Sequence, residues 1–503
     1  MSPGFFEIKC ERGRGDEKKL APFRHIAHYY PENRKGTMIE KAKLDKLKNI
    51  LEEKLGPGRV ITDDDIREVY SLDETSDLSA LPDLVIRAET TDEVSLVMKA
   101  CSETDVPVTP RGAGSGVTGG ALAMEGGVVL SLEKMNRIIE IDRENMVAIV
   151  EPGAITGDIQ KAALDEGLMY PPDPASLDIC SIGGNVAENA GGPRAVKYGI
   201  TADYILGLEC VLADGSVITT GGRMVKNVTG YNLTGIIIAS EGTLAVITRI
   251  ILRLLPAPKF TRDLLIPFAT LDEAVDAVYA IISNRVIPAT IEFMEQDAIL
   301  LVAKFLESDM PFPEAGAHLL IQVDGNHEED LYRDMERIGE VVEVDPEKII
   351  AAESDMQREK LWKARRSIRE SIHAESPVFL AEDCSVPRSK IPEFLKSLKE
   401  YFNTRGLSSV MFGHAGDGNV HIDILKGHME YDAWKNMLPE LKKEIYRRAI
   451  IVGGTITGEH GIGSTRREYL GLAMNAASLE LHRRIKAAFD PKGILNPGKV
   501  IPG

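Results

Sequence analysis

The chain has 503 residues, of which 44% are hydrophobic and 27% are charged, and its formal net charge is -18. A chain of this length exceeds what one hydrophobic core usually covers, so we expect two or more folded domains. The acidic balance argues against a nucleic-acid or anionic-membrane partner, because such partners require clustered Lys and Arg.

The five cysteines lie far apart in the chain and none forms a Cys-x-x-Cys pair. We therefore expect neither a disulfide framework nor an iron–sulfur cluster within this chain. No apolar stretch of signal-peptide or transmembrane length is present in the sequence. These features favour a reduced, cytoplasmic protein.

Residues 1–38 mix charged, proline and aromatic residues without periodicity, and we interpret them as an N-terminal extension, either a loose tail or a docking segment. From residue 39 the pattern predicts a helix, a strand at 83–88, a second helix and a strand at 106–109. Strands and hairpins follow as far as residue 258, where prolines indicate a domain boundary.

Residues 259–455 alternate helical and strand patterns and are predicted to form a second domain. Examples are a helix at 271–283 and a strand at 318–325. The remaining residues, 456–503, are predicted to be a short, turn-rich C-terminal segment.

A glycine-rich loop follows the strand at 106–109, and its Gly114, Gly116 and Gly119 satisfy G-x-G-x-x-G. A dinucleotide-binding Rossmann motif requires a helix that begins at such a loop, whereas here a strand pattern comes next, so we reject that interpretation. Backbone N–H groups of a glycine-dense loop still bind a diphosphate. Pro110 and Arg111 at its entrance would set its direction and add a positive charge.

Two further glycine loops occur in the same half of the chain, at residues 181–192 and 239–248. A single loop of this kind is usually a tight structural turn. Three within one half favour an elongated, polar, multi-phosphate ligand over three chance turns.

The stretches "PRGAGSGVTGGA", "SIGGNVAENAGG", "VKNVTGYNL" and "ASEGTLAVIT" resemble the FAD-binding half of flavoproteins of the vanillyl-alcohol-oxidase type. Within that superfamily, the chain from about residue 40 to 503 is similar to the D-2-hydroxyacid dehydrogenases and glycolate oxidase large subunits. The resemblance implies an α+β fold. Residues 39–258 would form two α+β subdomains with FAD between them. Residues 259–455 would form an α+β cap domain with an antiparallel sheet. Residues 456–503 would complete the active site and the FAD domain.

The resemblance also implies which residues contact FAD. Since residues 110–120 contain no His or Cys, we expect the FAD to be bound non-covalently, and Cys180 is expected to be a small buried filler. The implied contacts are Pro110, Arg111, Gly112, Ala113, Gly114, Ser115, Gly116, Pro172, Ser176, Gly184, Asn185, Asn189, Gly191, Glu241, Ile247 and Asn496.

The stretch "FGHAGDGNVHID" at residues 412–423 is predicted to be a hairpin that brings His414 and His421 together. Asp423 shares a face with His421. Paired imidazoles suit a divalent transition metal, but two ligands do not make a site, and a polar hairpin with incidental histidines remains the alternative.

Glu459 and His460 lie between glycines in "GGTITGEHGIG". Glu459 could complete a His-His-Glu set, and alternation along an extended chain would point His460 elsewhere, free to act as a base. The resemblance implies the same assignment: His414, His421 and Glu459 as ligands of a divalent metal (Zn, Mn or Fe), and His460 as the catalytic base.

Residues 361–372 are predicted to form one helix, with Arg365 and Arg369 on the same face. A solvated basic face is the usual meaning of such a run. The resemblance selects Arg365 to bind the substrate carboxylate through paired hydrogen bonds, with Asp423 as a second substrate contact. Relatives that act on 2-hydroxyglutarate carry a lysine at the position aligned with Ala381, so its absence predicts a monocarboxylate such as D-lactate or glycolate.

The predicted activity is FAD-dependent oxidation of a small D-2-hydroxy acid to the 2-oxo acid, by hydride transfer to flavin N5. The electrons would pass to a separate acceptor, either an electron-transferring flavoprotein, an iron–sulfur subunit or quinone. The alternatives are a D-2-hydroxyglutarate dehydrogenase, a colourless metal-dependent hydrolase and a non-catalytic relative. The sequence leaves a homodimer open.

Overall fold

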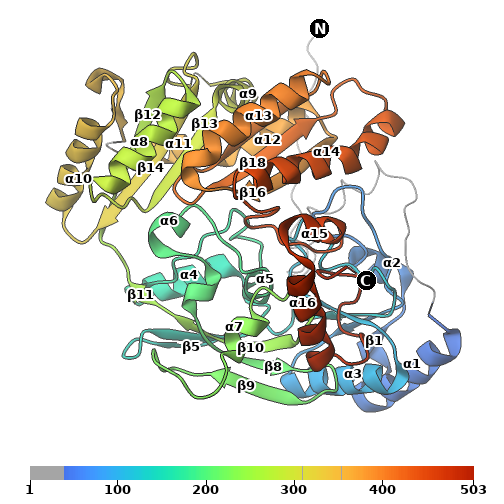
Figure 1. Cartoon of the computed structure of the whole chain (residues 1–503). Helices are drawn as coiled ribbons and strands as arrows, with labels where there is room; N and C mark the ends of the chain where they lie inside the picture. The colour runs from blue at the N-terminus through green and yellow to red at the C-terminus, as the bar shows by residue number, and fades with distance from the viewer. Residues whose placement is uncertain (1–38, 309, 353, 503) are drawn as a thin grey trace, which may run out of the picture.

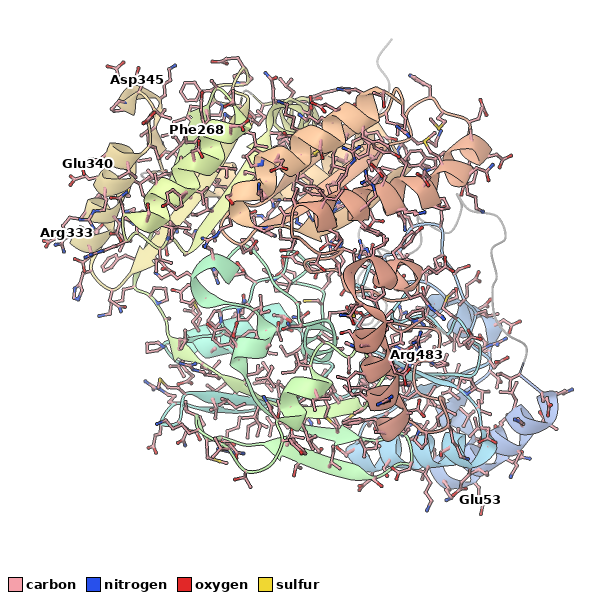
Figure 2. All side chains as sticks on the ribbon, viewed as in Figure 1. Glu53, Phe268, Arg333, Glu340, Asp345 and Arg483 are labelled. Carbon is pink, nitrogen blue, oxygen red and sulfur yellow. The ribbon has the colours of Figure 1, made fainter. Side chains whose placement is uncertain are left out.

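The computed structural model describes residues 39–308, 310–352 and 354–502, so the predicted extension at 1–38 lies outside the described residues. Figure 1 shows a large sheet with helices on both faces above two smaller sheets, with the C-terminal α16 lying against the lower half. Charged side chains such as Arg333 and Glu340 project outward from the edge of the upper layer (Figure 2).

The first subdomain is a four-stranded sheet of order β1-β2-β4-β3, in which β2, β4 and β3 are parallel. The apolar face of α1, with Leu47 and Leu51 fully buried, packs with α3 against this sheet. Its elements are α1 (Lys41–Leu55), η2 (Pro57–Arg59), β1 (Val60–Ile61), α2 (Asp64–Val69), β2 (Leu84–Arg87), α3 (Thr91–Thr104), β3 (Val108–Arg111) and β4 (Val128–Ser131).

The second subdomain is a five-stranded antiparallel sheet of order β5-β6-β10-β8-β9. A two-stranded sheet of β11 and β7 lies beside it. Its elements are β5 (Ile138–Asp142), β6 (Val147–Val150), α4 (Thr156–Asp165), β7 (Leu168–Met169), α5 (Ile182–Glu188), α6 (Ala195–Tyr198), η3 (Thr201–Tyr204), β8 (Ile205–Val211), β9 (Val217–Gly221), α7 (Leu233–Ile237), β10 (Val246–Arg253) and β11 (Leu255–Pro256).

The third sheet has seven antiparallel strands in the order β15-β12-β14-β13-β17-β18-β16. Helices α8, α10, α13 and α14 pack on one face of this cap sheet, and α9, α11 and α12 on the other. Its strands are β12 (Phe260–Phe268), β13 (Thr290–Glu295), β14 (Ala317–Gly325), β15 (Ile350–Ala351), β16 (Phe379–Ser385), β17 (Ser408–His414) and β18 (Asn419–Leu425). Its helices are α8 (Leu271–Ser283), α9 (Gln296–Leu306), α10 (Glu328–Val341), η4 (Pro346–Lys348), α11 (Asp355–Arg366), α12 (Ile368–Glu375), η5 (Arg388–Lys390), α13 (Ile391–Asn403) and α14 (Tyr431–Ile451).

The C-terminal segment leaves the cap and returns to the first subdomain. Leu495 forms a parallel bridge with Val108 of β3, and the Asn496 N–H donates to the Val108 carbonyl at 2.7 Å. The segment therefore joins the last part of the chain to the first sheet. Its helices are η6 (Arg467–Tyr469), α15 (Leu470–Ala473) and α16 (Ala476–Phe489).

The predicted α+β class with an antiparallel cap sheet is confirmed. Residues 112–127, between β3 and β4, contain no helix, in agreement with the rejection of a Rossmann motif. The prediction of one helix over 361–372 is wrong, because α11 ends at Arg366 and α12 begins at Ile368. Ser367 between them has a ψ of 0°, which interrupts the regular helical geometry.

The four cysteines within the described residues are free and buried, Cys180 among them. Burial raises the pKa of the Cys101 thiol and of the Cys384 thiol, as expected for inert core residues. Among the described helices, none combines the length and apolarity needed to cross a membrane.

Candidate active site

A row of polar side chains crosses the cap sheet where four strands, β13, β17, β18 and β16, lie side by side. Glu292 on β13 is directly opposite His414 on β17, and Asp383 on β16 is directly opposite His421 on β18. Alternation along β17 puts His414 on the same face as Phe412, which packs against the α9, α11 and α12 side. The sheet thus flanks the histidine hairpin with a buried carboxylate on each side.

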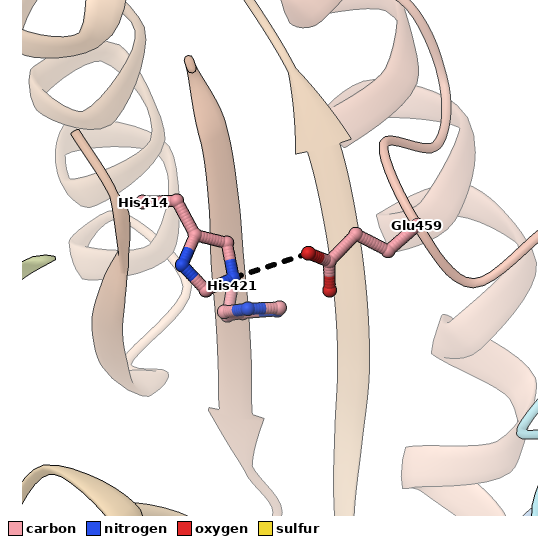
Figure 3. A group of neighbouring side chains, drawn as sticks. All are labelled: His414, His421 and Glu459. Carbon is pink, nitrogen blue, oxygen red and sulfur yellow. Dashed lines mark ion pairs between the residues drawn. The ribbon is translucent and has the colours of Figure 1, made fainter. Parts of the chain in front are cut away.

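The two hairpin histidines and Glu459 meet in a single cluster, as the sequence predicted for a metal site (Figure 3). The rings of His414 and His421 are 5.3 Å apart between centroids, and His414 Nε2 lies 3.1 Å from Glu459 Oε1. One potential ligand atom from each of the three residues lies within 4.8 Å of the others. This spacing is compatible with a shared cation.

Glu292 is a site residue that the sequence did not reveal. Its carboxylate is fully buried, with Oε1 2.6 Å from His414 Nδ1 and Oε2 2.6 Å from an Arg365 guanidinium nitrogen. Burial alone would raise the pKa of Glu292, but the charges of His414 and Arg365 hold it below its ordinary value. One carboxylate therefore orients both a predicted metal ligand and the predicted substrate arginine.

His460 does not point away from the cluster as alternation predicted. Its ring stacks on that of His421, with 5.7 Å between centroids, and its Nδ1 lies 3.0 Å from Asp383 Oδ1. Residues 458–460 form bends rather than a strand, so strict alternation does not apply to them. Asp383, like Glu292, was missed by the sequence analysis.

Arg365 and Arg369 reach the same sheet face from α11 and α12. Arg365 lies over the Phe412 ring at 4.8 Å, and its buried Nε has no hydrogen-bond partner among the described residues. Arg369 donates to Asp423 at 2.8 Å, and Asp423 is fully buried. An unpaired guanidinium donor beside the histidine cluster suits an incoming carboxylate.

The titration behaviour of the cluster follows from burial and neighbouring charges. Burial lowers the pKa of His414, but Glu292 and Glu459 outweigh it and raise this pKa well above its ordinary value. Burial and the nearby cationic groups lower the pKa of His421 well below its ordinary value. Burial also raises the pKa of Asp423 to about 6, against the opposing charge of Arg369.

The donor set fits a divalent cation. His421 Nδ1 is buried and has no hydrogen-bond partner among the described residues, which is costly for a polar atom without a ligand. Glu292 orients the His414 ring through Nδ1, as carboxylates commonly do for metal-bound imidazoles. His414, His421 and Glu459 are the residues that would hold the ion.

The three glycine loops meet in the FAD-binding half. The Ala113 N–H donates to Ser181 Oγ at 3.2 Å, which joins the first and second loops. Asn496 Nδ2 donates to the Gly120 and Glu241 carbonyls at 3.2 and 2.7 Å, which joins the first and third loops. A Cβ at Gly112 would collide with Ser181 Oγ, so a larger residue there would require the Ser181 hydroxyl to move and to give up its bond to the Ala113 N–H.

The second loop also contacts the predicted metal cluster. A Cβ at Gly191 would lie 3.2 Å from Glu459 Oε1, so backbone from the FAD-binding half lies directly beside the cluster. At Gly116 a Cβ would meet nothing within 4 Å, which leaves that loop backbone open to a ligand. The second loop thus lies against the cluster, and the open glycine backbone at Gly116 fits a diphosphate.

Several predicted flavin contacts use their side chains internally. Asn185 donates to Thr156 at 2.7 Å, and Asn189 accepts from the Ala202 N–H at 2.8 Å. The Glu241 carboxylate accepts the Ile462 and Gly463 N–H groups, both at 2.7 Å. These residues would therefore approach a ligand mainly through their backbone.

Arg111 is the last residue of β3 and lies at the entrance of the first loop. Its guanidinium is buried against Gly114 and over the Tyr70 ring. Its Nη1 is a buried donor without a hydrogen-bond partner among the described residues. The remaining predicted contacts lie in four places. Pro110 is in β3, and the first loop consists of Gly112, Ala113, Gly114, Ser115 and Gly116. Pro172 and Ser176 precede α5, Gly184 lies in the first turn of α5, and Ile247 is buried in β10.

Two family models match this chain and together span most of the described residues. The FAD binding domain matches residues 82–221, and the C-terminal domain of FAD linked oxidases matches residues 257–500. This chain belongs to the FAD-linked oxidases. The matches bear out the resemblance inferred from the glycine loops.

Relatives in this family cover nearly the same length. The glycolate oxidase subunit GlcD of Bacillus subtilis is 42% identical, covering 86% of this chain and 92% of its own. A D-lactate dehydrogenase of Anaerostipes hadrus is 37% identical, with coverages of 89% and 96%. A D-2-hydroxyglutarate dehydrogenase of Stutzerimonas stutzeri is 31% identical, with coverages of 92% and 99%.

Solved structures agree on the fold at low sequence identity. A p-cresol methylhydroxylase has a TM-score of 0.75 at 19% identity, covering 93% of this FAD-linked oxidase and 98% of its own chain. A 4-ethylphenol oxidase from Gulosibacter chungangensis has a TM-score of 0.74 at the same identity and coverages. The chain therefore has the vanillyl-alcohol-oxidase type of fold.

Proposed function

We propose that this FAD-linked oxidase is a dehydrogenase of small D-2-hydroxy monocarboxylic acids, with D-lactate or glycolate as substrate. The observation that carries the proposal is the gathering of Arg365, His414, His421, Glu459 and His460 beside Gly191 of a flavin-type loop. The names of the relatives support the same substrate class.

Each side chain has a separate role in the proposed reaction. Arg365 binds the substrate carboxylate with its unpaired Nε and fixes its orientation. A divalent cation on His414, His421 and Glu459 would lower the pKa of the substrate hydroxyl. His460 takes the hydroxyl proton, and FAD, when bound non-covalently, supplies the acceptor for the hydrogen that leaves C2.

The surroundings of Ala381 favour a monocarboxylate. Ala381 is directly opposite Asp423 on β18, and the charge of Asp423 is already paired with Arg369. The Arg369–Asp423 pair is neutral overall, so this position offers no unpaired cation for a second carboxylate. A higher specificity constant for D-2-hydroxyglutarate than for D-lactate would overturn the monocarboxylate assignment.

The test of the proposed function is anaerobic mixing of the purified yellow protein with a panel of 2-hydroxy acids of both hands. Bleaching of the flavin absorbance by D-lactate or glycolate is the expected result. A colourless protein that hydrolyses esters or amides would favour the metal-dependent hydrolase. A yellow protein that no hydroxy acid bleaches would favour a non-catalytic relative.

The base assignment predicts the behaviour of His460→Ala. The variant should keep its FAD, but the limiting rate of flavin reduction should fall by about 10²–10⁴-fold, because proton removal is lost. Anaerobic stopped-flow absorbance measures that rate. His482→Ala is a matched control, since the Ser478 carbonyl on α16 is the one hydrogen-bond partner of His482 Nδ1 within the described part of the chain. Unchanged reduction in His460→Ala would refute the assignment.

Electrons must then leave to a separate acceptor, which we propose is an electron-transferring flavoprotein or an iron–sulfur subunit. In the described part of the chain every cysteine is free and buried, so this part offers no ligands for an iron–sulfur cluster. Mixing the pre-reduced protein with a purified electron-transferring flavoprotein should restore its flavin absorbance. Reoxidation by oxygen alone, at a rate that no such protein accelerates, would contradict this partner.

A further inference from the structure

Asn419, the first residue of β18, has a buried amide that the proposed reaction does not use. The residue is 4% exposed, and neither its Oδ1 nor its Nδ2 has a hydrogen-bond partner among the described residues. Burying an amide without partners lowers the stability of a folded protein. Both ends of this amide are therefore open to a partner that the described residues do not supply.

The sheet places this amide beside two of the predicted cation ligands. Asn419 is directly opposite His414 in the pairing of β17 with β18, and it precedes His421 by two residues on the same strand. Residues that are directly opposite each other share a face of the sheet, and so do residues two apart along one strand. The side chain of Asn419 therefore projects from the same face of the cap sheet as both imidazoles.

The segment that carries the third predicted ligand, Glu459, lies against the same amide. A Cβ at Gly458 would collide with Asn419 Oδ1 and would lie 2.6 Å from its Cγ. The Gly458 N–H donates to Asp383 Oδ2 at 2.7 Å, which holds this backbone in place. Asn419 is thus surrounded by the positions that provide all three predicted ligands.

We propose that Asn419 supplies a further ligand of the cation through its amide oxygen. Since neither end of the amide is bonded to a described residue, either end can face the cation site, and the oxygen is the end that binds a cation. The ligand set becomes two imidazole nitrogens, a carboxylate oxygen and an amide oxygen. The inference rests on the cation site of the proposed function and extends that site by one residue.

An amide oxygen affects the choice between Mn²⁺ and Zn²⁺. Carboxylate and carbonyl oxygens are ligands that suit Mn²⁺. A catalytic zinc site takes three protein ligands, and His414, His421 and Glu459 already provide that number. Asn419 should therefore contribute more to the affinity for Mn²⁺ than to the affinity for Zn²⁺.

Asn419→Leu separates a ligand from a structural amide, because leucine has a similar shape without polar atoms. The amide has no partner in the metal-free protein, so the thermal unfolding temperature of the metal-free variant should equal or exceed that of the wild type. Its Mn²⁺ affinity should nevertheless fall at least about tenfold, measured by calorimetry on metal-free protein. Its Zn²⁺ affinity should fall less.

Two further variants complete the comparison. Asn419→Asp keeps an oxygen at this position and adds a buried charge, so its Mn²⁺ affinity should equal or exceed that of the wild type, while its metal-free form should unfold at a lower temperature. Val420→Ala is the matched control, since Val420 is the next residue of β18 and is fully buried in the core on the other face of the sheet. It should lower the unfolding temperature and leave both cation affinities unchanged.

The ligand is observed directly by pulsed electron–nuclear resonance of Mn²⁺-loaded protein labelled with ¹³C at the side-chain carbonyl of asparagine. We expect a ¹³C coupling to Mn²⁺ in the wild type and its loss in Asn419→Leu. No coupling in the wild type, or equal falls in Mn²⁺ and Zn²⁺ affinity in Asn419→Leu, would overturn the proposal. Cation binding is measured without substrate, so a failure of hydroxy acids to bleach the flavin would count against the proposed function alone.

Discussion

At the scale of single residues, Glu292 links the two binding functions of the site. Its Oε1 bonds to His414, and its Oε2 forms an ion pair with Arg365. In Glu292→Gln the amide oxygen must face Arg365, which only donates, so the NH₂ group faces His414 Nδ1 and the His414 proton moves to Nε2. Nε2 is the nitrogen beside Glu459, so we expect Mn²⁺ affinity to fall about 10–100-fold.

Calorimetric titration of the metal-free protein with Mn²⁺ measures this loss. Glu295→Gln is the control, because Glu295 is a buried carboxylate of the same strand that pairs with Lys399, away from the histidines. Equal Mn²⁺ affinities in Glu292→Gln and the wild type would show that Glu292 does not orient His414.

The difference between the residues that were predicted and those that were missed has a physical basis. His414 and His421 are seven residues apart, so a hairpin brings them together and the spacing alone predicts the contact. Glu292 and Asp383 reach the same histidines through strand pairings between segments distant in the sequence. Strand order is not encoded in local periodicity, so one sequence could not place these carboxylates.

At the scale of the elements, His318 on β14 makes the stability of the cap depend on pH. Its ring is fully buried, Nε2 bonds to the Phe312 carbonyl, and burial lowers its pKa to about 4. Between pH 6.5 and 4 the unfolded chain binds a proton that the folded protein does not, so stability falls as the pH falls. Below pH 4 the free energy of unfolding is lower by about 3 kcal/mol because of this histidine.

Urea unfolding at pH 7 and pH 4.5 tests this dependence in the wild type and in His318→Gln. Because carboxylates such as Asp423 titrate over the same range, the informative quantity is the difference between the two proteins. The wild type should lose more stability on acidification than His318→Gln. Parallel losses would mean that His318 is already protonated in the folded state.

Elements with strong local patterns were predictable, and those set by tertiary contacts were less so. The helix at 271–283 and the strand at 318–325 lie where the sequence predicted them, because apolar periodicity decides both. The interruption at Ser367 was not predictable, since the composition on either side of it is helical. The bends at 458–460 depend on Asp383, which no local pattern reveals.

At the scale of the whole molecule, two carboxylates from different domains hold one segment. Asp383 of the cap accepts N–H groups at 458–459, and Glu241 of the FAD-binding half accepts those of Ile462 and Gly463. In Glu241→Gln one of these N–H groups would face an NH₂ group, so we expect FAD affinity to fall at least about tenfold. Mn²⁺ affinity should fall less, because Asp383 still holds the backbone of Gly458 and Glu459.

Fluorescence of FAD released on dilution measures the affinity of Glu241→Gln. Glu140→Gln serves as the control, because Glu140 forms an exposed pair with Arg223 on the same half of the molecule and such pairs contribute little. An unchanged FAD affinity would show that the contacts of Glu241 to Ile462 and Gly463 do not support FAD binding. Equal falls in FAD affinity and Mn²⁺ affinity would show that Glu241 and Asp383 do not act on separate parts of the segment.

The bridge between Leu495 and Val108 has a consequence for biosynthesis. A ribosome must synthesise the chain as far as Asn496 before β3 gains this neighbour and before Asn496 can tie the first and third glycine loops. A nascent chain that stops before Leu495 lacks both contacts, and we expect translation products truncated there to be unable to retain the coenzyme.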